Sequence, residues 1–322
     1  MKVPRVRIAH LPTRIEFLER LSAALQGPQI FCKRDDQTGL GFGGNKTRKL
    51  EFLLAEAQQA GARTLLSVGA IQSNHCRQVA AMAARYGFDC ILVLSGSEPE
   101  IASGNLFLDQ LFGAKIVWAN RENRNQVLDQ VFQDAQLQGK KPYKIPYGGS
   151  SATGMMGYVE AINELKSQES DFDWIITASS SGGTQSGMLL GAEISGFQGK
   201  ILGISIEDHA AQLRESVSRL IREGSALLGL KIDLPLDKIL VNDDYLGGGY
   251  GVMGPAEVEA IQMFASLEGL LLDPVYTGRA AAGMIDLIRK GFFDQKEKVL
   301  FWHTGGTPAL FAEPYLSMLQ KS

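Results

Sequence analysis

Short β-rich runs alternate with amphipathic helical runs along the chain, and this alternation constrains the fold more than any other feature. Leu50, Leu53, Leu54 and Ala57 recur at helical spacing, and Gly61 ends the predicted helix. Alternating strands and helices are typical of parallel sheets covered by helices. We therefore expect an α/β fold with parallel-rich sheets flanked by helices. The predicted strands cover residues 30–33, 64–68, 89–94, 115–118, 143–146, 174–178, 201–206 and 299–303.

Length and composition limit the class of protein. A chain of 322 residues with 45% apolar and 21% charged residues is expected to form two domains with large cores. The formal net charge of −3 argues against a nucleic-acid surface, and no apolar run is long enough to span a bilayer. Residues 1–12 lack a continuous apolar core, so no secretory signal is expected.

The residue types that bind metals or form disulfides are sparse. The 4 histidines lie far apart and no pair has zinc-ligand spacing, so we expect no metal site. The 3 cysteines, Cys32, Cys76 and Cys90, give no disulfide framework, which fits a reducing cytoplasm.

Lys46 occupies an unusual place for a lysine. The run Gly43-Gly44-Asn45-Lys46 delivers it to the first turn of a predicted helix, whose positive end favours anions. It is either a solvated surface residue or a functional amine. Positive potential and burial both lower the pKa of an amine and bring it closer to a neutral nucleophile.

Residues 39–47 also come close to two nucleotide-binding patterns. Residues 39–44 fit G-x-G-x-x-G, but the apolar strand that should precede this pattern is missing. Asn45 stands between Gly44 and Lys46, so the phosphate-loop pattern fails by one residue. A nucleotide-binding protein that uses this loop remains the alternative from a different functional class.

Polar, glycine-containing turns follow several predicted strands. Parallel sheets bind ligands at the carboxyl ends of their strands, so turns at these ends predict a common site. We therefore expect a single site between two α/β units, built from residues 69–75, 148–154, 179–184 and 303–307.

The turn at residues 179–184 reads Ser-Ser-Ser-Gly-Gly-Thr and opens a predicted helix. Main-chain N–H groups and hydroxyls in such a turn form a phosphate-binding cup. The structural alternative is an ordinary turn in which Thr184 is the N-cap. No lysine follows, so the cup suits a monophosphate better than a triphosphate with magnesium.

The second polar turn contains Gln72, Ser73, Asn74 and His75 at another predicted helix start. Its neutral donors suit a carboxylate, while Ser73 or Asn74 could equally be a structural N-cap. His75 is either a proton carrier or a first-turn residue without a chemical role.

Two tyrosines are further site candidates. Tyr276 lies between a predicted strand at residues 270–272 and a helix, where it is either a core tyrosine or a site residue. Tyr250 stands among the glycines of residues 247–251, which predict a mobile active-site loop.

Together these residues resemble the pyridoxal-phosphate enzymes of the tryptophan-synthase β fold, fold type II. The chain is most similar to the family of D-cysteine desulfhydrases and 1-aminocyclopropane-1-carboxylate (ACC) deaminases. The resemblance runs from Phe31-Cys-Lys-Arg-Asp-Asp36 to His303-Thr-Gly-Gly-Thr-Pro-Ala-Leu310. Residues 43–49 and 72–75 match in order and spacing.

The resemblance implies a role for each candidate residue. Lys46 would carry pyridoxal 5′-phosphate as a Schiff base and act as the catalytic base. Catalytic roles would also fall to Ser73, Tyr250 and Tyr276. The substrate would meet Gln72, Ser73, His75 and Tyr276. The cofactor would be held by Lys46, Asn74, Ser181, Gly182, Gly183 and Thr184, with Thr304 or Thr277 at the pyridine nitrogen.

Two departures separate the branches of the family. ACC deaminases resemble one another in having Glu after the tyrosine of Asp-Pro-Val-Tyr and Gln after Ser-Asn, whereas this chain has Thr277 and His75. Both residues, with Ser103-Gly-Asn-Leu-Phe-Leu-Asp109, resemble the desulfhydrase branch. We therefore expect α,β-elimination of D-cysteine to pyruvate, hydrogen sulfide and ammonia. ACC deamination and elimination from cysteate or serine remain alternatives.

The resemblance also implies an organisation. A large cofactor-binding domain would comprise residues 1–48 and 161–322, and a small α/β domain residues 49–160. The protein would be a cytoplasmic homodimer that acts on a small amino acid and binds neither nucleic acid nor membrane.

Overall fold

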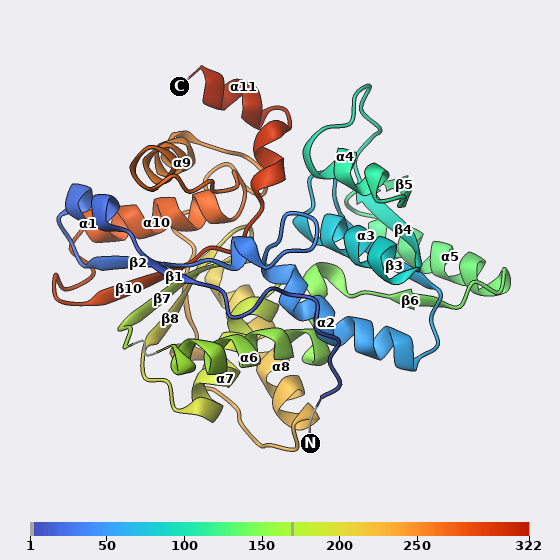
Figure 1. The fold of residues 1–322 in the computed structure, drawn as a ribbon, viewed down its shortest axis with the longest axis horizontal. Coiled ribbons are helices and arrows are strands. Elements are labelled where there is room, and N and C mark those ends of the chain that lie inside the picture. Colours follow the sequence, from blue (N-terminus) through green and yellow to red (C-terminus); the bar gives the residue numbers. More distant parts are fainter. Residues whose placement is uncertain (1–2, 169–170, 322) are drawn as a thin grey trace.

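The computed structural model describes residues 3–168 and 171–321, and its strands form two sheets (Figure 1). The larger sheet has six strands, of which only the β1–β2 pair is antiparallel. Its spatial order is β1 (Ile15–Phe17), β2 (Gln29–Lys33), β10 (Lys298–Trp302), β7 (Trp174–Ser179), β8 (Lys200–Ser205) and β9 (Leu240–Asn242).

The smaller sheet has four strands, all parallel, and occupies the other half of the molecule (Figure 1). Its spatial order is β5 (Lys115–Ala119), β4 (Asp89–Ser95), β3 (Thr64–Ala70) and β6 (Pro142–Lys144). The chain thus enters the large sheet, builds the small one, and returns to complete the large one.

All but one of the strands predicted from the sequence are present, with ends that shift by one or two residues. The short strands β1 and β9 were not predicted, because three residues carry too little periodicity to be recognised. The strand expected at residues 270–272 is wrong. That segment pairs with no described strand, and Tyr276 therefore stands between a loop and a helix.

Helices cover both faces of the large sheet because its strands are apolar on both sides. Trp174 and Ile176 point to one core, and Ile175 points to the other. The first core is closed by α1 (Glu19–Leu25), α9 (Pro255–Glu268) and α10 (Thr277–Arg289). The second is closed by α6 (Ala152–Ser167), α7 (Gly183–Ser195) and α8 (Ala210–Leu227).

The strands of the small sheet are also apolar on both sides, and helices cover both of its faces. Leu92 packs in one core and Ile91 in the other. The first is covered by α2 (Asn45–Gln59), α3 (Asn74–Tyr86) and α4 (Gly104–Leu111), and the second by α5 (Arg124–Leu137). The remaining helical segments are α11 (Tyr315–Gln320) and the 3₁₀ turns η1 (Asp35–Gln37), η2 (Tyr147–Gly149), η3 (Leu236–Lys238) and η4 (Thr307–Phe311).

Helix α2 joins the two halves of the molecule. Leu50 and Leu53 pack in the core of the small sheet, whereas Phe52 packs with α6 beneath the large sheet. The predicted domain boundaries, after residues 48 and 160, fall inside α2 and α6, and this division stays a prediction. Within the described residues, no helix combines the length and apolarity needed to cross a membrane.

Candidate active site

Gly43 and Gly44 bring the chain into α2 through a turn that other residues could not adopt. Their φ angles are 65° and 120°, in the region that disfavours a side chain. A Cβ on Gly43 would lie 2.2 Å from the carbonyl oxygen of Asp36, and one on Gly44 would lie 3.0 Å from that of Thr304. Lys46 is therefore placed in the first turn of α2, as the sequence predicted.

Lys46 lines a pocket at the carboxyl ends of the parallel strands of both sheets. All four polar turns predicted to converge contribute to its wall. Removal of the amine from water lowers the pKa of Lys46 to about 8. The wall comprises Asn45, Lys46, Ser73, Asn74, His75, Tyr147, Gly148, Ala178, Ser179, Ser180, Ser181, Gly182, Thr184, Tyr276 and Thr304.

A cluster of charged residues fixes α2 from the side away from the pocket. We call Lys33, Asp35, Arg48 and Glu164 the ion cluster. Arg48 donates to both oxygens of Asp35 at 2.8 Å and also to Glu164, which accepts from Lys33 at 2.7 Å. The cluster joins strand β2, helix α2 and helix α6. It therefore holds the helix that carries Lys46, two residues before Arg48.

The turn at residues 179–182 presents free donors to the pocket. Helix α7 begins at Gly183 after the left-handed Gly182, and no side chain caps it. Thr184 is thus not the N-cap, contrary to the structural alternative, and its Oγ1 accepts from Asn45 Nδ2 at 3.0 Å. Uncapped N–H groups at a helix start attract an anion.

The start of α3 has a structural N-cap, which is one of the two alternatives considered for it. Ser73 is the N-cap, because its hydroxyl accepts from the main-chain N–H of Cys76 at 3.2 Å. An accepting hydroxyl keeps its own proton, so Ser73 can still donate into the pocket. His75 contacts the Ser67 hydroxyl through Nε2 at 2.9 Å. Burial, with the charges of Lys46 and Lys49, holds the pKa of His75 well below its usual range.

The two tyrosine hydroxyls meet although they are far apart in the sequence. Tyr250 and Tyr276 share a hydrogen bond of 2.7 Å, and only Tyr276 lines the pocket. Burial raises the pKa of both phenols above the usual value, so both keep their protons at neutral pH. The glycine-rich loop that carries Tyr250 is tied down, since Arg279 donates to Gly249 and Tyr315 donates to Gly251.

Several predicted residues do not line the pocket. The Thr277 hydroxyl donates to Asp273 at 2.8 Å, whereas Thr304 forms part of the wall. The Gln72 amide is engaged by the main chain of Ser103 and Asn105. Gly183 begins α7 just beyond the wall. The chemical roles of all these residues stay predictions.

Other residues of the site were not singled out from the sequence. Asn45 and Tyr147 line the pocket, and Asp273 accepts hydrogen bonds from the main-chain N–H groups of Val275, Tyr276 and Thr277. Asp273 thereby fixes the turn that presents Tyr276. An Asp-Pro pair before a helix was the available signal for it.

These residues fit pyridoxal 5′-phosphate. The pocket offers an amine with a lowered pKa for the aldehyde and an uncapped helix start with serines for the phosphate. Ser179 Oγ is buried without a hydrogen-bond partner among the described residues, so a polar group remains available to a ligand. A Cβ on Gly148 would lie 2.6 Å from Ser181 Oγ and 3.5 Å from Lys46 Nζ, which explains why a glycine faces this space.

Comparisons with known proteins identify the family of the chain. The family model described as "Pyridoxal-phosphate dependent enzyme" matches residues 6–305. The chain is 41% identical to a D-cysteine desulfhydrase of Klebsiella pneumoniae (strain 342), with 98% of each protein covered. It is 42% identical to one of Salmonella choleraesuis (strain SC-B67), covering 97% of this chain and 96% of the relative.

Solved structures show the same fold. An ACC deaminase homologue superposes with a TM-score of 0.91 at 37% identity, covering 99% of this chain and 96% of the other. A fungal L-serine ammonia-lyase from Rhizomucor miehei shares the fold alone, with a TM-score of 0.71 at 17% identity and coverage of 98% and 99%. The expected type II fold is thus confirmed, and the nucleotide-binding interpretation of residues 39–47 is wrong. The chain belongs to the family of pyridoxal-phosphate dependent enzymes.

Proposed function

We propose that this enzyme is a D-cysteine desulfhydrase, which eliminates sulfide from D-cysteine and, with water, yields pyruvate, ammonia and hydrogen sulfide. The observation that carries the proposal is the identity of 41% with a D-cysteine desulfhydrase over nearly the whole of both chains. It is supported by a pocket that unites an amine of lowered pKa with hydroxyl groups.

The proposal assigns the cofactor to residues from both halves of the molecule. Lys46 would anchor pyridoxal phosphate, the uncapped start of α7 with Ser181 and Gly182 would hold its phosphate, and Asn74 would donate to its ring oxygen. Thr304, on the pocket wall, would meet the pyridine nitrogen in preference to Thr277. The bound cofactor supplies an electron sink for the charge left on the α-carbon.

Lys46 would also move the α-proton. With a pKa of about 8, its Nζ exchanges a proton near neutral pH far more readily than a free lysine, whose pKa is about 10.4. Ser73 would bind the substrate carboxylate through the hydroxyl proton left free by its cap. The Tyr250–Tyr276 pair would hold a phenolic proton beside the leaving sulfur.

The absence of an acid in the wall favours elimination over ring opening. None of the described residues that line the pocket is an aspartate or glutamate. An acid at the pyridine nitrogen deepens the electron sink, and opening a cyclopropane needs a deep sink more than loss of sulfide does. ACC deamination is the second candidate, because an ACC deaminase homologue is 37% identical.

Product analysis separates the two activities. Purified holoenzyme should release sulfide and pyruvate from D-cysteine and little 2-oxobutanoate from ACC. A panel of D- and L-cysteine, cysteate and serine then defines the chirality and the leaving group. Release of 2-oxobutanoate from ACC without sulfide from D-cysteine would disprove the proposal.

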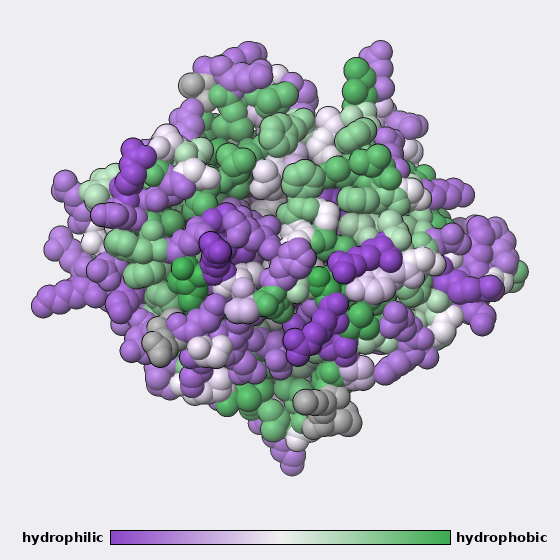
Figure 2. Space-filling model, in the orientation of Figure 1, coloured by the Kyte–Doolittle hydropathy of each residue, from purple (hydrophilic) through white to green (hydrophobic). Residues whose placement is uncertain are grey.

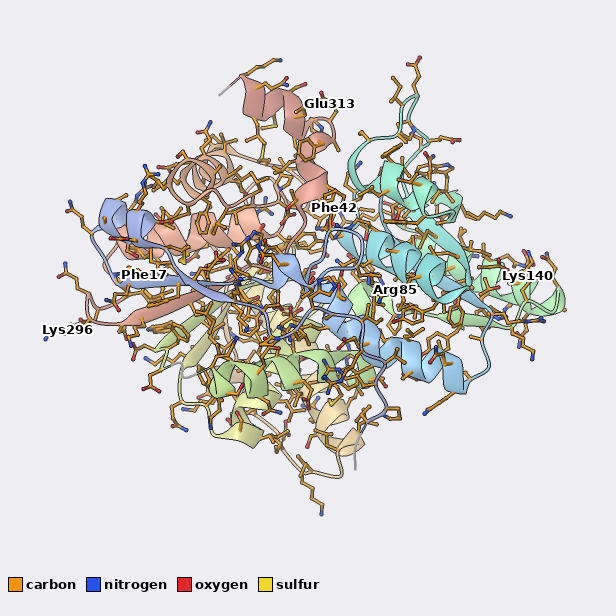
Figure 3. All side chains as sticks on the ribbon, viewed as in Figure 1. Phe17, Phe42, Arg85, Lys140, Lys296 and Glu313 are labelled. Carbon is orange, nitrogen blue, oxygen red and sulfur yellow. The ribbon has the colours of Figure 1, made fainter. Side chains whose placement is uncertain are left out.

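We further propose that the enzyme is a homodimer whose interface includes an apolar patch of Phe42, Phe107, Leu111 and Phe311. These side chains are between 51% and 66% exposed, although they are large and apolar. They lie near one another because α4 packs against η4 and Gly41 approaches Phe112. Figure 2 shows apolar residues on this face, and Figure 3 places Phe42 between the two halves.

Light scattering after gel filtration tests the dimer. The wild type should have twice the mass of the chain, and Phe107→Glu should reduce that mass by half without loss of helicity. A monomeric wild type would disprove this interface.

A cytoplasmic location is also proposed, supported by three buried, unpaired cysteines.

A further inference from the structure

Asn105 lies outside the pocket wall, yet its side chain contacts two residues at the start of α3. Its Nδ2 donates to the main-chain oxygen of Gln72 at 3.0 Å and to Oδ1 of Asn74 at 2.9 Å. Asn105 is fully buried in the first turn of α4. A residue from another helix therefore touches the asparagine that forms part of the pocket wall.

These contacts fix which way both amides point. A main-chain oxygen can only accept a hydrogen bond, so the group of Asn105 that faces Gln72 is its NH₂ group. That group uses its second proton on Asn74, so the atom of Asn74 facing Asn105 is its oxygen. The NH₂ group of Asn74 must then point away from Asn105, and it lies beside Gly306, where a Cβ would be 2.7 Å from Asn74 Nδ2.

We propose that Asn105 is a positioning residue, which holds Asn74 with its NH₂ group toward the pocket, ready to donate to the ring oxygen of bound pyridoxal phosphate. The inference rests on the role proposed above for Asn74. A free asparagine could present either its oxygen or its nitrogen, and only the nitrogen attracts an anionic ring oxygen. Asn105 removes the unproductive orientation before the cofactor arrives.

The neighbouring residues hold Asn105 in register with α3. Gln72 donates to the oxygen of Ser103 at 3.0 Å and accepts from the N–H of Asn105 at 2.8 Å. Gly104 has a φ of 57°, and a Cβ there would lie 2.5 Å from Gln72 Oε1. The glycine therefore allows the start of α4 to approach α3 closely enough for Asn105 to reach Asn74.

This arrangement leaves one polar atom of Asn105 without a hydrogen bond to a described residue. Its Oδ1 is buried and has no partner among the described residues. A buried acceptor without a donor destabilises the fold, so an apolar residue would suit α4 better if this position only filled space. The polar side chain is explained by the two protons that it donates.

The test is cofactor affinity, measured by titrating the cofactor-free enzyme with pyridoxal phosphate in the absence of substrate. Asn105→Asp is the main variant, because a carboxylate donates no proton and a carboxylic acid donates only one, so two acceptors cannot both be served. We expect the dissociation constant to rise roughly ten- to a hundredfold. The pH at which the visible absorption of the bound cofactor changes should also shift.

A double-mutant cycle shows whether the effect passes through Asn74. In an Asn74→Ala background, Asn105→Asp should change the affinity by less than about threefold. Asp109→Asn, one turn later on α4, is the matched control. Asn has nearly the same shape as Asp, burial raises the pKa of Asp109 and so disfavours its charged form, and the affinity should not change.

The outcomes are distinct. An equal loss in both backgrounds, or wild-type affinity of Asn105→Asp, overturns the inference. If Asn74→Ala itself leaves the affinity unchanged, the proposed role of Asn74 fails and the inference with it. If Asn105→Asp does not fold, Asn105→Ala serves instead and should show the same dependence on Asn74. Because no substrate is present, every result is independent of whether D-cysteine is the substrate.

Discussion

The ion cluster and the pocket lie on either side of the first turns of α2. They differ in whether their buried polar groups have hydrogen-bond partners. In the ion cluster, Asp35 accepts hydrogen bonds from Thr13, Arg48, Tyr158 and Trp302. In the pocket, no hydrogen bond joins Lys46 Nζ to a described residue, and Ser179 Oγ is unpaired. A satisfied cluster holds the structure together, whereas an unsatisfied one is arranged for a ligand.

Lys46 and Lys49 repeat the contrast within a single helix turn. Lys49 donates to the carbonyl oxygen of Gly148 at 3.1 Å, and burial followed by the charge of Lys46 lowers its pKa. Burial alone lowers the pKa of Lys46. A lowered pKa therefore does not identify the functional lysine. The functional lysine is identified by its access to the pocket and by the lack of a hydrogen-bond partner for its Nζ among the described residues.

The sharpest test of this comparison replaces each lysine. Lys46→Ala should lower turnover by roughly 10²–10⁴-fold or more and abolish the visible absorption band of the bound cofactor, because the anchoring and proton-transferring amine is gone. Lys49→Met should keep the visible band, even if turnover falls. If Lys46→Ala keeps the visible band and full turnover, Lys46 is not the lysine that anchors the cofactor and this assignment is wrong.

The next largest effect is expected in the ion cluster. Asp35→Ala should lower the free energy of unfolding by about 3–5 kcal/mol, since it leaves Arg48 buried without its bidentate partner. Chemical denaturation of the cofactor-free protein measures this change. The control is Arg289→Met, which removes an exposed ion pair with Glu259 and should cost less than about 1 kcal/mol. Similar losses in both variants would refute the structural role of the cluster.

Removal of the charge from Lys46 should have the opposite effect on stability and raise the free energy of unfolding. A folded pKa of about 8, below the ordinary 10.5, means that the folded state holds an unfavourable charge below pH 8. Lys46→Met should therefore raise the free energy of unfolding of the cofactor-free protein at pH 7 by up to about 3 kcal/mol. The gain should decline between pH 8 and about 10.5. A loss of stability at pH 7 would contradict this account of the pocket.

The smallest effect is the acid dependence of the ion cluster. Burial opposes ionisation of Asp35, but the charge and hydrogen bonds of Arg48 outweigh it and bring the pKa to about 2, below the usual 3.8. A depressed carboxyl pKa stabilises the fold above pH 4, and this stabilisation is lost as the pH falls toward 2. It should amount to about 2 kcal/mol. The difference in unfolding free energy between wild type and Asp35→Asn, measured across this range, should shrink accordingly.

Much of the fold followed from local patterns. The confirmed strands have enough β-rich residues to be recognised, and α2 ends at Gln59, just before the left-handed Gly61 that was predicted to stop it. The exceptions are short or extended segments, β1, β9 and residues 270–272. Whether such a segment pairs depends on a neighbouring strand and not on its own composition.

The site was predictable only in part. Gly43, Gly44 and Lys46 are consecutive, so their relation follows from backbone geometry, and the serines of residues 179–181 precede a helix by local pattern. The Tyr250–Tyr276 hydrogen bond, the Asn45–Thr184 hydrogen bond and the contact of Asn105 with Asn74 join residues distant in sequence. No local propensity encodes such pairs.

The sequence by itself determined that two α/β units would place polar turns at one edge and that a lysine would begin a helix there. Periodicity and glycine conformations are local, so they act before the chain is folded. Only the tertiary structure decided which lysine has no hydrogen-bond partner among the residues that the structure describes, and which way the Asn74 amide points. Burial and hydrogen-bond orientation depend on groups brought together from both halves of the molecule, and they exist only after those halves have packed.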